Sequence, residues 1–148
     1  MKTLRERIES DIISAQKAAD AARLGVLRLL LSEIKNKEIE KHWAGKGDAL
    51  IDEEIVDVLR REVKKRKDAV TLFIKGGRTD LADKDTADIV VIEAYLPELM
   101  SREDIARVVD EVRASGVSDF PSVMREAMKQ LKGKADGALV SEIIKSRM

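Results

Sequence analysis

The sequence predicts an all-α protein, and three observations carry this prediction. Apolar residues recur at three- and four-residue spacing through most of the 148 residues, which is the period of an amphipathic helix. No stretch of useful length alternates apolar and polar residues as a half-buried strand does. Charged residues make up 38% of the chain and aromatic residues only 3%, so we expect helices packed through aliphatic side chains.

Two helices are expected before residue 44. The first runs from Leu4 toward residue 22, with apolar or small residues at helical spacing: Leu4, Ile8, Ile12, Ala15, Ala19 and Ala22. The second runs to about Trp43 and is apolar around much of its circumference, so we expect it to be central. Glycines at positions 45 and 47 end this helix, and Asp48 or Asp52 is expected to cap the next one.

A third helix is expected between an acidic start at residues 52–54 and the pair Gly76-Gly77. The fourth runs from about Thr79 toward Pro97, because proline biases the residue before it away from helical backbone. We place a domain boundary there. This predicts a helical amino-terminal domain of about four helices (residues 1–97) and a small three-helix carboxy-terminal domain (residues 98–148).

A basic run lies in the middle of the third helix, where Arg60, Lys64 and Lys67 share one face. Two interpretations of this ridge stay open. It can be a surface that contacts phosphate groups, or a solvated face whose charges are balanced by Glu62 and Asp68.

The carboxy-terminal domain is expected to hold three helices. Ser101 with Asp104 resembles a capping box at the first start, and Asp119 with Pro121 suits the second. Residues 132–137 form the turn into the last helix, which Asp136 caps by accepting from the backbone of residue 138 or 139. Lysines beside a helix start suit a bound phosphate, while the alternative is a plain turn with solvated lysines.

Composition excludes several classes of site and partner. Without cysteine and with only His42, the chain lacks the residues of a nucleophilic triad, so we predict no catalytic residues. Its acidic groups have the spacing of helix surfaces, so no metal or cofactor site is predicted. No apolar segment has membrane-spanning length and the charged start lacks a signal segment, which predicts a cytoplasmic protein without membrane contact.

Three separated motifs then converge on one family: Arg23–Leu30 (RLGVLRLL), Glu93–Pro97 (EAYLP) and Met124–Ser141 (MREAMKQLKGKADGALVS). In order and spacing the chain resembles the GatB/YqeY family. The resemblance implies similarity to the tail of the B subunit of the glutamine-dependent aspartyl/glutamyl-tRNA amidotransferase, which grips tRNA. The family label would be a carbon–nitrogen ligase with glutamine as amido-N-donor, although the catalytic parts of that enzyme have no counterpart in this short chain.

The resemblance transfers binding residues only at the closing motif. There it implies RNA contact through Lys132, Gly133, Lys134, Ala135, Asp136 and Gly137. From its charge and position, Lys129 is expected to contact RNA beside this turn, and the ridge of Arg60, Lys64 and Lys67 is expected as a secondary surface. The amidotransferase tail often has Asn-Pro where this chain has Asp136-Gly137, so the local backbone can differ.

The expected function is a tRNA-binding or amidotransferase-related accessory protein that contacts the backbone of tRNA or another structured RNA. One alternative is a subunit that docks on an amidotransferase or an aminoacyl-tRNA synthetase without touching RNA. Two others are an enzyme that acts alone on glutamine and charged tRNA, and a general protein-interaction domain with no RNA role.

Overall fold

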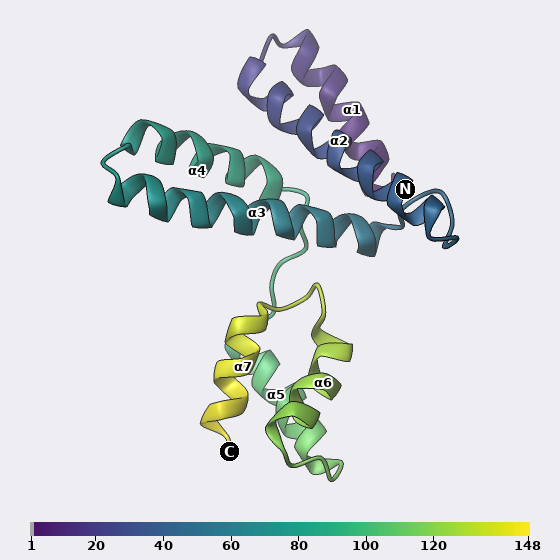
Figure 1. Cartoon of the computed structure of the whole chain (residues 1–148), viewed down its shortest axis with the longest axis vertical. Coiled ribbons are helices and arrows are strands. Elements are labelled where there is room, and N and C mark those ends of the chain that lie inside the picture. The colour runs from purple at the N-terminus through teal and green to yellow at the C-terminus, as the bar shows by residue number, and fades with distance from the viewer. Residues whose placement is uncertain (1) are drawn as a thin grey trace. The chain divides into compact units, whose positions relative to one another are not determined.

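The structure, a computed structural model, describes residues 2–148. Within this range it contains seven helices and no strand, so the all-α prediction is confirmed (Figure 1). The helices are α1 (Leu4–Lys17), α2 (Ala21–Trp43), α3 (Asp52–Lys75), α4 (Thr79–Glu93), α5 (Arg102–Ala114), α6 (Phe120–Leu131) and α7 (Gly137–Ser146).

The chain divides into two compact units, Met1–Leu96 and Pro97–Met148. Each unit has its own aliphatic core. In the first unit the largest fully buried side chains are Ile8, Leu27, Leu30, Ile34, Ile55, Leu59 and Ile92. In the second they are Ile105, Val109, Leu131, Ile143 and Ile144. That each half is a domain able to fold without the other stays a prediction.

The first helix ends earlier than the sequence pattern predicted. α1 stops at Lys17, and Ala19 has φ 54°, the single positive φ among the described non-glycine residues. Asp20 then caps α2 by accepting a hydrogen bond from the backbone N–H of Arg23 at 3.2 Å. The prediction was wrong beyond Lys17 because alanines at helical spacing fit a turn as well as a helix, whereas the capping aspartate decides where α2 begins.

The start of α3 is capped by a residue that the sequence analysis did not name. Ile51 is the N-cap, and the Glu54 carboxylate reaches back to accept from the Ile51 N–H at 3.1 Å. Asp48 instead bonds to His42, and Asp52 accepts from the backbone N–H of Leu4 at 3.2 Å. The two predicted caps are therefore wrong, because each carboxylate serves a partner outside the helix start.

Tyr95 connects α1, the start of α2 and the end of α4. Its hydroxyl donates a hydrogen bond to Asp11 on α1, and Arg23 on α2 lies 3.8 Å from the same carboxylate. The guanidinium carbon of Arg7 lies 5.2 Å from the centroid of the Tyr95 ring. Tyr95 is buried in the first core, so this hydrogen bond ties a core side chain to α1.

The environment of Tyr95 is expected to raise the pH at which its phenol loses a proton. Burial, and then the hydrogen bond to Asp11, raise the pKa of Tyr95 to about 12, whereas an unfolded tyrosine ionises near about pH 10. The pKa of Tyr95 is higher in the folded chain than in the unfolded chain. The protonated Tyr95 therefore stabilises the folded chain fully below about pH 10, and this stabilisation is lost as the pH rises toward about 12.

Tyr95 is the single tyrosine of the chain, so the phenolate absorbance reports it directly. We expect the titration of the Tyr95 phenol to have its midpoint at about pH 12 in the native protein and at about pH 10 in denaturant. Circular dichroism at each pH shows whether the helices persist. A native midpoint near about pH 10, with the helices intact, would contradict this prediction.

Candidate functional site

The turn between α6 and α7 contains the residues first expected to bind a ligand. It is held in place from both sides, because the Met100 N–H donates to the Lys134 carbonyl at 2.8 Å and the Ala135 N–H donates to the Leu131 carbonyl at 3.1 Å. Gly133 has φ 77° and Ala135 is buried. Asp136 accepts from the Ala138 N–H at 3.0 Å, so the predicted cap is confirmed.

The cations of this turn differ in how far they are neutralised. Lys129, on α6, pairs with Glu126 at 2.9 Å. Lys132 and Lys134 are exposed and form no ion pair within residues 2–148. Two lysines without an ion pair in the described residues therefore lie in the turn that precedes α7, while the third predicted lysine, Lys129, is already paired.

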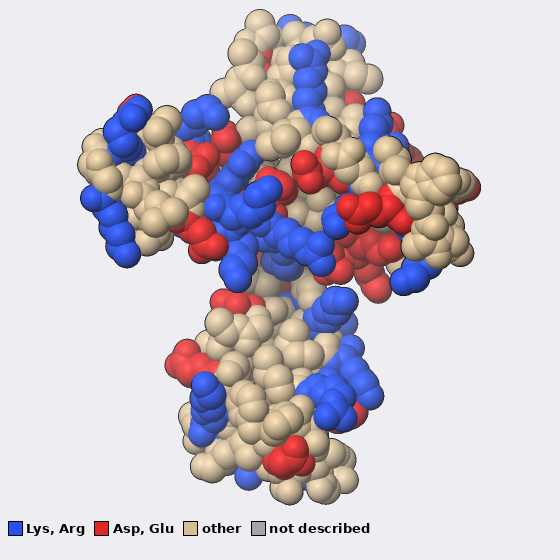
Figure 2. Space-filling model, in the orientation of Figure 1, with Lys and Arg blue, Asp and Glu red and all other residues tan. Residues whose placement is uncertain are grey.

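The basic ridge on α3 consists of Arg60, Lys64 and Lys67. Within the described part of the chain, neither Lys64 nor Lys67 forms an ion pair. Burial lowers the pKa of Arg60. Glu62, named as a balancing partner, is buried and pairs with Lys65 at 3.3 Å instead. Lysine and arginine side chains gather over the middle of α3 in Figure 2.

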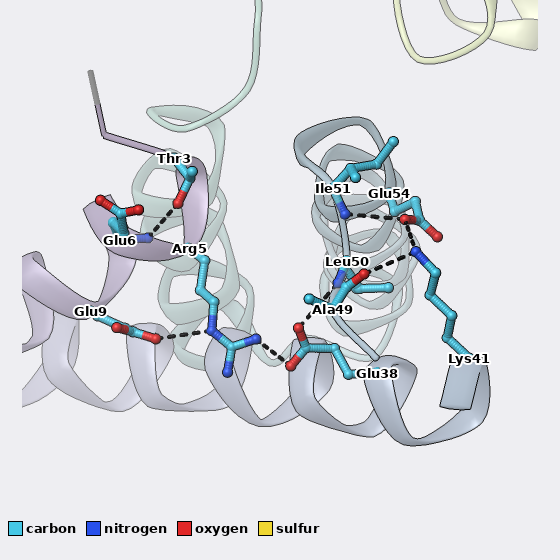
Figure 3. Close-up of polar contacts among 10 residues, drawn as sticks. All are labelled: Thr3, Arg5, Glu6, Glu9, Glu38, Lys41, Ala49, Leu50, Ile51 and Glu54. Carbon is cyan, nitrogen blue, oxygen red and sulfur yellow. Dashed lines mark hydrogen bonds and ion pairs between the residues drawn. The ribbon is translucent and has the colours of Figure 1, made fainter. Parts of the chain in front are cut away.

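The corner between α2 and α3, where three helix ends meet, was not among the predicted sites (Figure 3). Arg5 on α1 binds Glu38 on α2, and Glu38 also accepts from the Leu50 N–H at 3.1 Å. Lys41 donates to the Ala49 carbonyl at 2.9 Å and to Glu54 at 2.6 Å. These bonds tie the loop between the helices to the last turns of α2.

The charges of this corner stabilise one another. The hydrogen bond to Glu38 raises the pKa of Arg5. The hydrogen bond from Lys41, followed by that from the Ile51 N–H, lowers the pKa of the Glu54 carboxyl. These hydrogen bonds favour the charged forms of Arg5 and Glu54, and the corner is an ordered support for the side chains that it presents to solvent.

This support presents an apolar surface that we call the Trp43 patch. A hollow of about 310 Å³ is lined by Lys35, Glu38, Ile39, His42, Trp43 and Asp48. Trp43 is 81% exposed and Ile39 is 56% exposed. The rings of His42 and Trp43 meet edge to face, with centroids 5.5 Å apart, and His42 is bonded to Asp48. In the sequence, the Trp43 patch is indicated by an isoleucine and a tryptophan that lie four residues apart at the end of a polar helix.

Within residues 2–148, no three or more histidine, aspartate or glutamate side chains are grouped so that they could hold a metal ion. Across the same residues, no helix combines the length and the apolar character needed to cross a membrane.

Comparison with known proteins gives one family and several relatives. The family model described as "Yqey-like protein" matches residues 5–148. A Candida glabrata protein named "Altered inheritance of mitochondria protein 41, mitochondrial" is 34% identical over 132 residues, which cover 87% of this chain and 69% of that protein. Proteins of the same name from Kluyveromyces lactis (33% identical; 87% and 67% covered) and Lachancea thermotolerans (30%; 86% and 68%) are also similar.

These names contradict two expectations. The relatives are named for mitochondrial inheritance and not for tRNA binding or amidotransfer, so the expected function as a tRNA-binding or amidotransferase-related accessory protein is wrong. They are named as mitochondrial, which also overturns the expected cytoplasmic location. Both expectations failed because helix-turn motifs and composition record how a chain folds, whereas partner and location depend on features that a shared fold leaves free.

Proposed function

The chain belongs to the YqeY-like protein family, and we propose that it works as a protein-binding module whose main contact is the Trp43 patch. The observation that carries this proposal is a tryptophan 81% exposed on a corner that is otherwise tied by hydrogen bonds. The similarity to the amidotransferase tail stays a prediction from the three sequence motifs.

The chemistry of the patch suits a protein partner. A large indole left in water is a frequent anchor of protein interfaces, where it fills a pocket on the partner and dominates the binding energy. Ile39 extends the apolar surface, while Lys35, Glu38 and Asp48 give it a polar rim. An apolar centre with a polar rim is the usual anatomy of such an interface.

Two further features support a binding role. The relatives' names state a process, altered inheritance of mitochondria, and a location, and they state no reaction. The single histidine of the chain is exposed and bonded to Asp48, and cysteine does not occur in the sequence. A role in holding a partner needs none of the reactive side chains that this sequence lacks.

The α6–α7 turn is proposed as a separate contact of the second unit with a protein partner. Lys132 and Lys134 are exposed and form no ion pair within the described residues, and both lie just before the first turn of α7. Lysines and helix N-termini both favour negative charge, so carboxylates of a protein partner suit this turn.

Replacing Trp43 with alanine tests the proposal. A photo-crosslinking residue is first placed at Ile39 in cells, and the same residue at Val90, an exposed apolar position on α4, serves as the control site. The protein captured only from Ile39 is then purified. Trp43→Ala should weaken its binding by at least about 30-fold, because a central tryptophan contributes about 2 kcal/mol or more to an interface.

Stability measurements separate binding from folding. Trp43 is mostly in water, so Trp43→Ala should change the free energy of unfolding by less than about 0.5 kcal/mol. Ile13→Ala, at an exposed isoleucine on α1, should leave the affinity unchanged. The proposal fails if no protein is captured from Ile39 above the Val90 control, or if Trp43→Ala binds as tightly as the unmodified chain.

A further inference from the structure

The outer half of the α3–α4 hairpin is poorly packed. We call residues 64–75 of α3 and 79–85 of α4 the distal hairpin. No side chain of α3 after Val63 is buried, and Ala82 is the one buried side chain in the α4 part. The turn between the two helices lies away from α1 and α2 in Figure 1. Helices gain most of their stability by packing an apolar face, which this segment leaves incomplete.

Apolar side chains of the distal hairpin remain in contact with water. Leu72 is 67% exposed and Ile74 is 59% exposed. Val70, Phe73 and Leu81 are half-buried. Leu72 lies on the opposite face of α3 from Val70 and Ile74, because positions two residues apart are about 200° apart around a helix. The other four residues, Val70, Phe73, Ile74 and Leu81, therefore mark the surface that another chain can cover.

The two helices of the distal hairpin carry opposite charge. Residues 64–75 hold five basic side chains against Asp68, and residues 79–85 hold three acidic ones against Lys84. Lys64, Lys67 and Lys75 form no ion pair within the described residues, and neither do Asp83 and Asp85. Among the described residues, no cation of residues 64–75 therefore forms an ion pair with a carboxylate of residues 79–85.

The geometry points to a second copy of this chain as the occupant of the distal hairpin. Two hairpins related by a two-fold axis place the basic α3 of each copy beside the acidic α4 of the other. The four helices then form a bundle around Val70, Phe73, Ile74 and Leu81. A two-fold contact uses the same surface on both copies, and a hairpin with one basic and one acidic helix is self-complementary in this arrangement.

The size of the segment sets the expected strength. A contact between two short hairpins belongs to the small class of interface, below about 1,200 Å², so we expect a dissociation constant on the order of 10–100 µM. Sedimentation of the full chain from about 10 µM to about 1 mM should show a monomer–dimer equilibrium that weakens as salt is added. A chain that stays monomeric over this range overturns the inference.

Charge reversal identifies the surface. In one variant Asp83→Lys/Asp85→Lys makes both helices of the distal hairpin basic, and in a second Lys64→Glu/Lys67→Glu/Lys75→Glu makes both acidic. Each should self-associate at least about 10-fold more weakly than the unmodified chain, because like charges then face each other across the two-fold axis. The two variants mixed in equal amounts should associate again, since every basic helix meets an acidic one.

A matched control excludes general attraction between oppositely charged molecules. Arg107→Glu/Arg125→Glu/Lys129→Glu changes the net charge as much as Lys64→Glu/Lys67→Glu/Lys75→Glu, but at exposed positions of the second unit. It should dimerise like the unmodified chain and should not associate with Asp83→Lys/Asp85→Lys. Circular dichroism of each variant confirms that it is folded. Failure of the mixed pair to associate, with both variants folded, overturns the inference.

Discussion

Replacing Arg66 with methionine is expected to lower the free energy of unfolding by about 3 kcal/mol. Arg66 lies between α3 and α4, with its guanidinium nitrogens 3.9 Å from Glu62 and 4.0 Å from Asp88. Both carboxylates belong to buried residues, 5% and 7% exposed. Among the described residues, removing the arginine leaves two buried negative charges with the exposed Lys65 and Lys84 as their counterions.

The expected loss in the free energy of unfolding lies at the lower end of the range for a broken buried ion pair, about 3–5 kcal/mol, because those two lysines remain. Urea unfolding measures the loss, and Arg61→Met on the exposed face of the same helix should change stability by less than about 0.5 kcal/mol. The triple variant Glu62→Gln/Arg66→Met/Asp88→Asn should be more stable than Arg66→Met alone. If it is equally destabilised, the buried charges are not the cause.

Replacing Ile143 with alanine is expected to unfold the second unit while the first remains folded. Ile143 is 2% exposed in the core shared by α5, α6 and α7. Truncating a buried isoleucine costs about 2–5 kcal/mol, which is comparable to the whole stability of a unit of this size. The two cores share no side chain, so the loss should stay within residues 97–148.

Hydrogen exchange with mass spectrometry reads the two units separately. Peptides after Pro97 should exchange on the order of 100-fold faster in Ile143→Ala, and peptides from the first unit should keep their protection. Gln130→Ala, at an exposed position on α6, serves as the control. If protection falls equally on both sides of Pro97, the two halves unfold together and the predicted division into domains is wrong.

Local rules predicted the helices well because their causes lie within a few residues. The caps Asp119 and Asp136 accept from backbone groups three and two residues away, and both were expected from the sequence. Apolar spacing likewise identified the seven helical segments. The error at Ala19 arose where the pattern of small residues was compatible with two backbone conformations.

The candidate site was less predictable. The sequence marked the lysines of the α6–α7 turn, and the structure leaves Lys132 and Lys134 unpaired among the described residues but pairs Lys129 with Glu126. The Trp43 patch was missed. An exposed tryptophan at a helix end resembles any other helix end until the neighbouring loop is placed, and the loop is placed by Glu38 and Lys41.

The sequence by itself determined the helical class, most helix boundaries and the positions of unusual charge. Tertiary structure alone decided which polar groups were already used. Asp52 bonds to Leu4, 48 residues away, and the Tyr95 hydroxyl bonds to Asp11, 84 residues away. Helix periodicity and caps arise from neighbours in the chain, whereas pairing and exposure arise from segments that meet only after folding. The surfaces left open for a partner therefore became visible only in the folded chain.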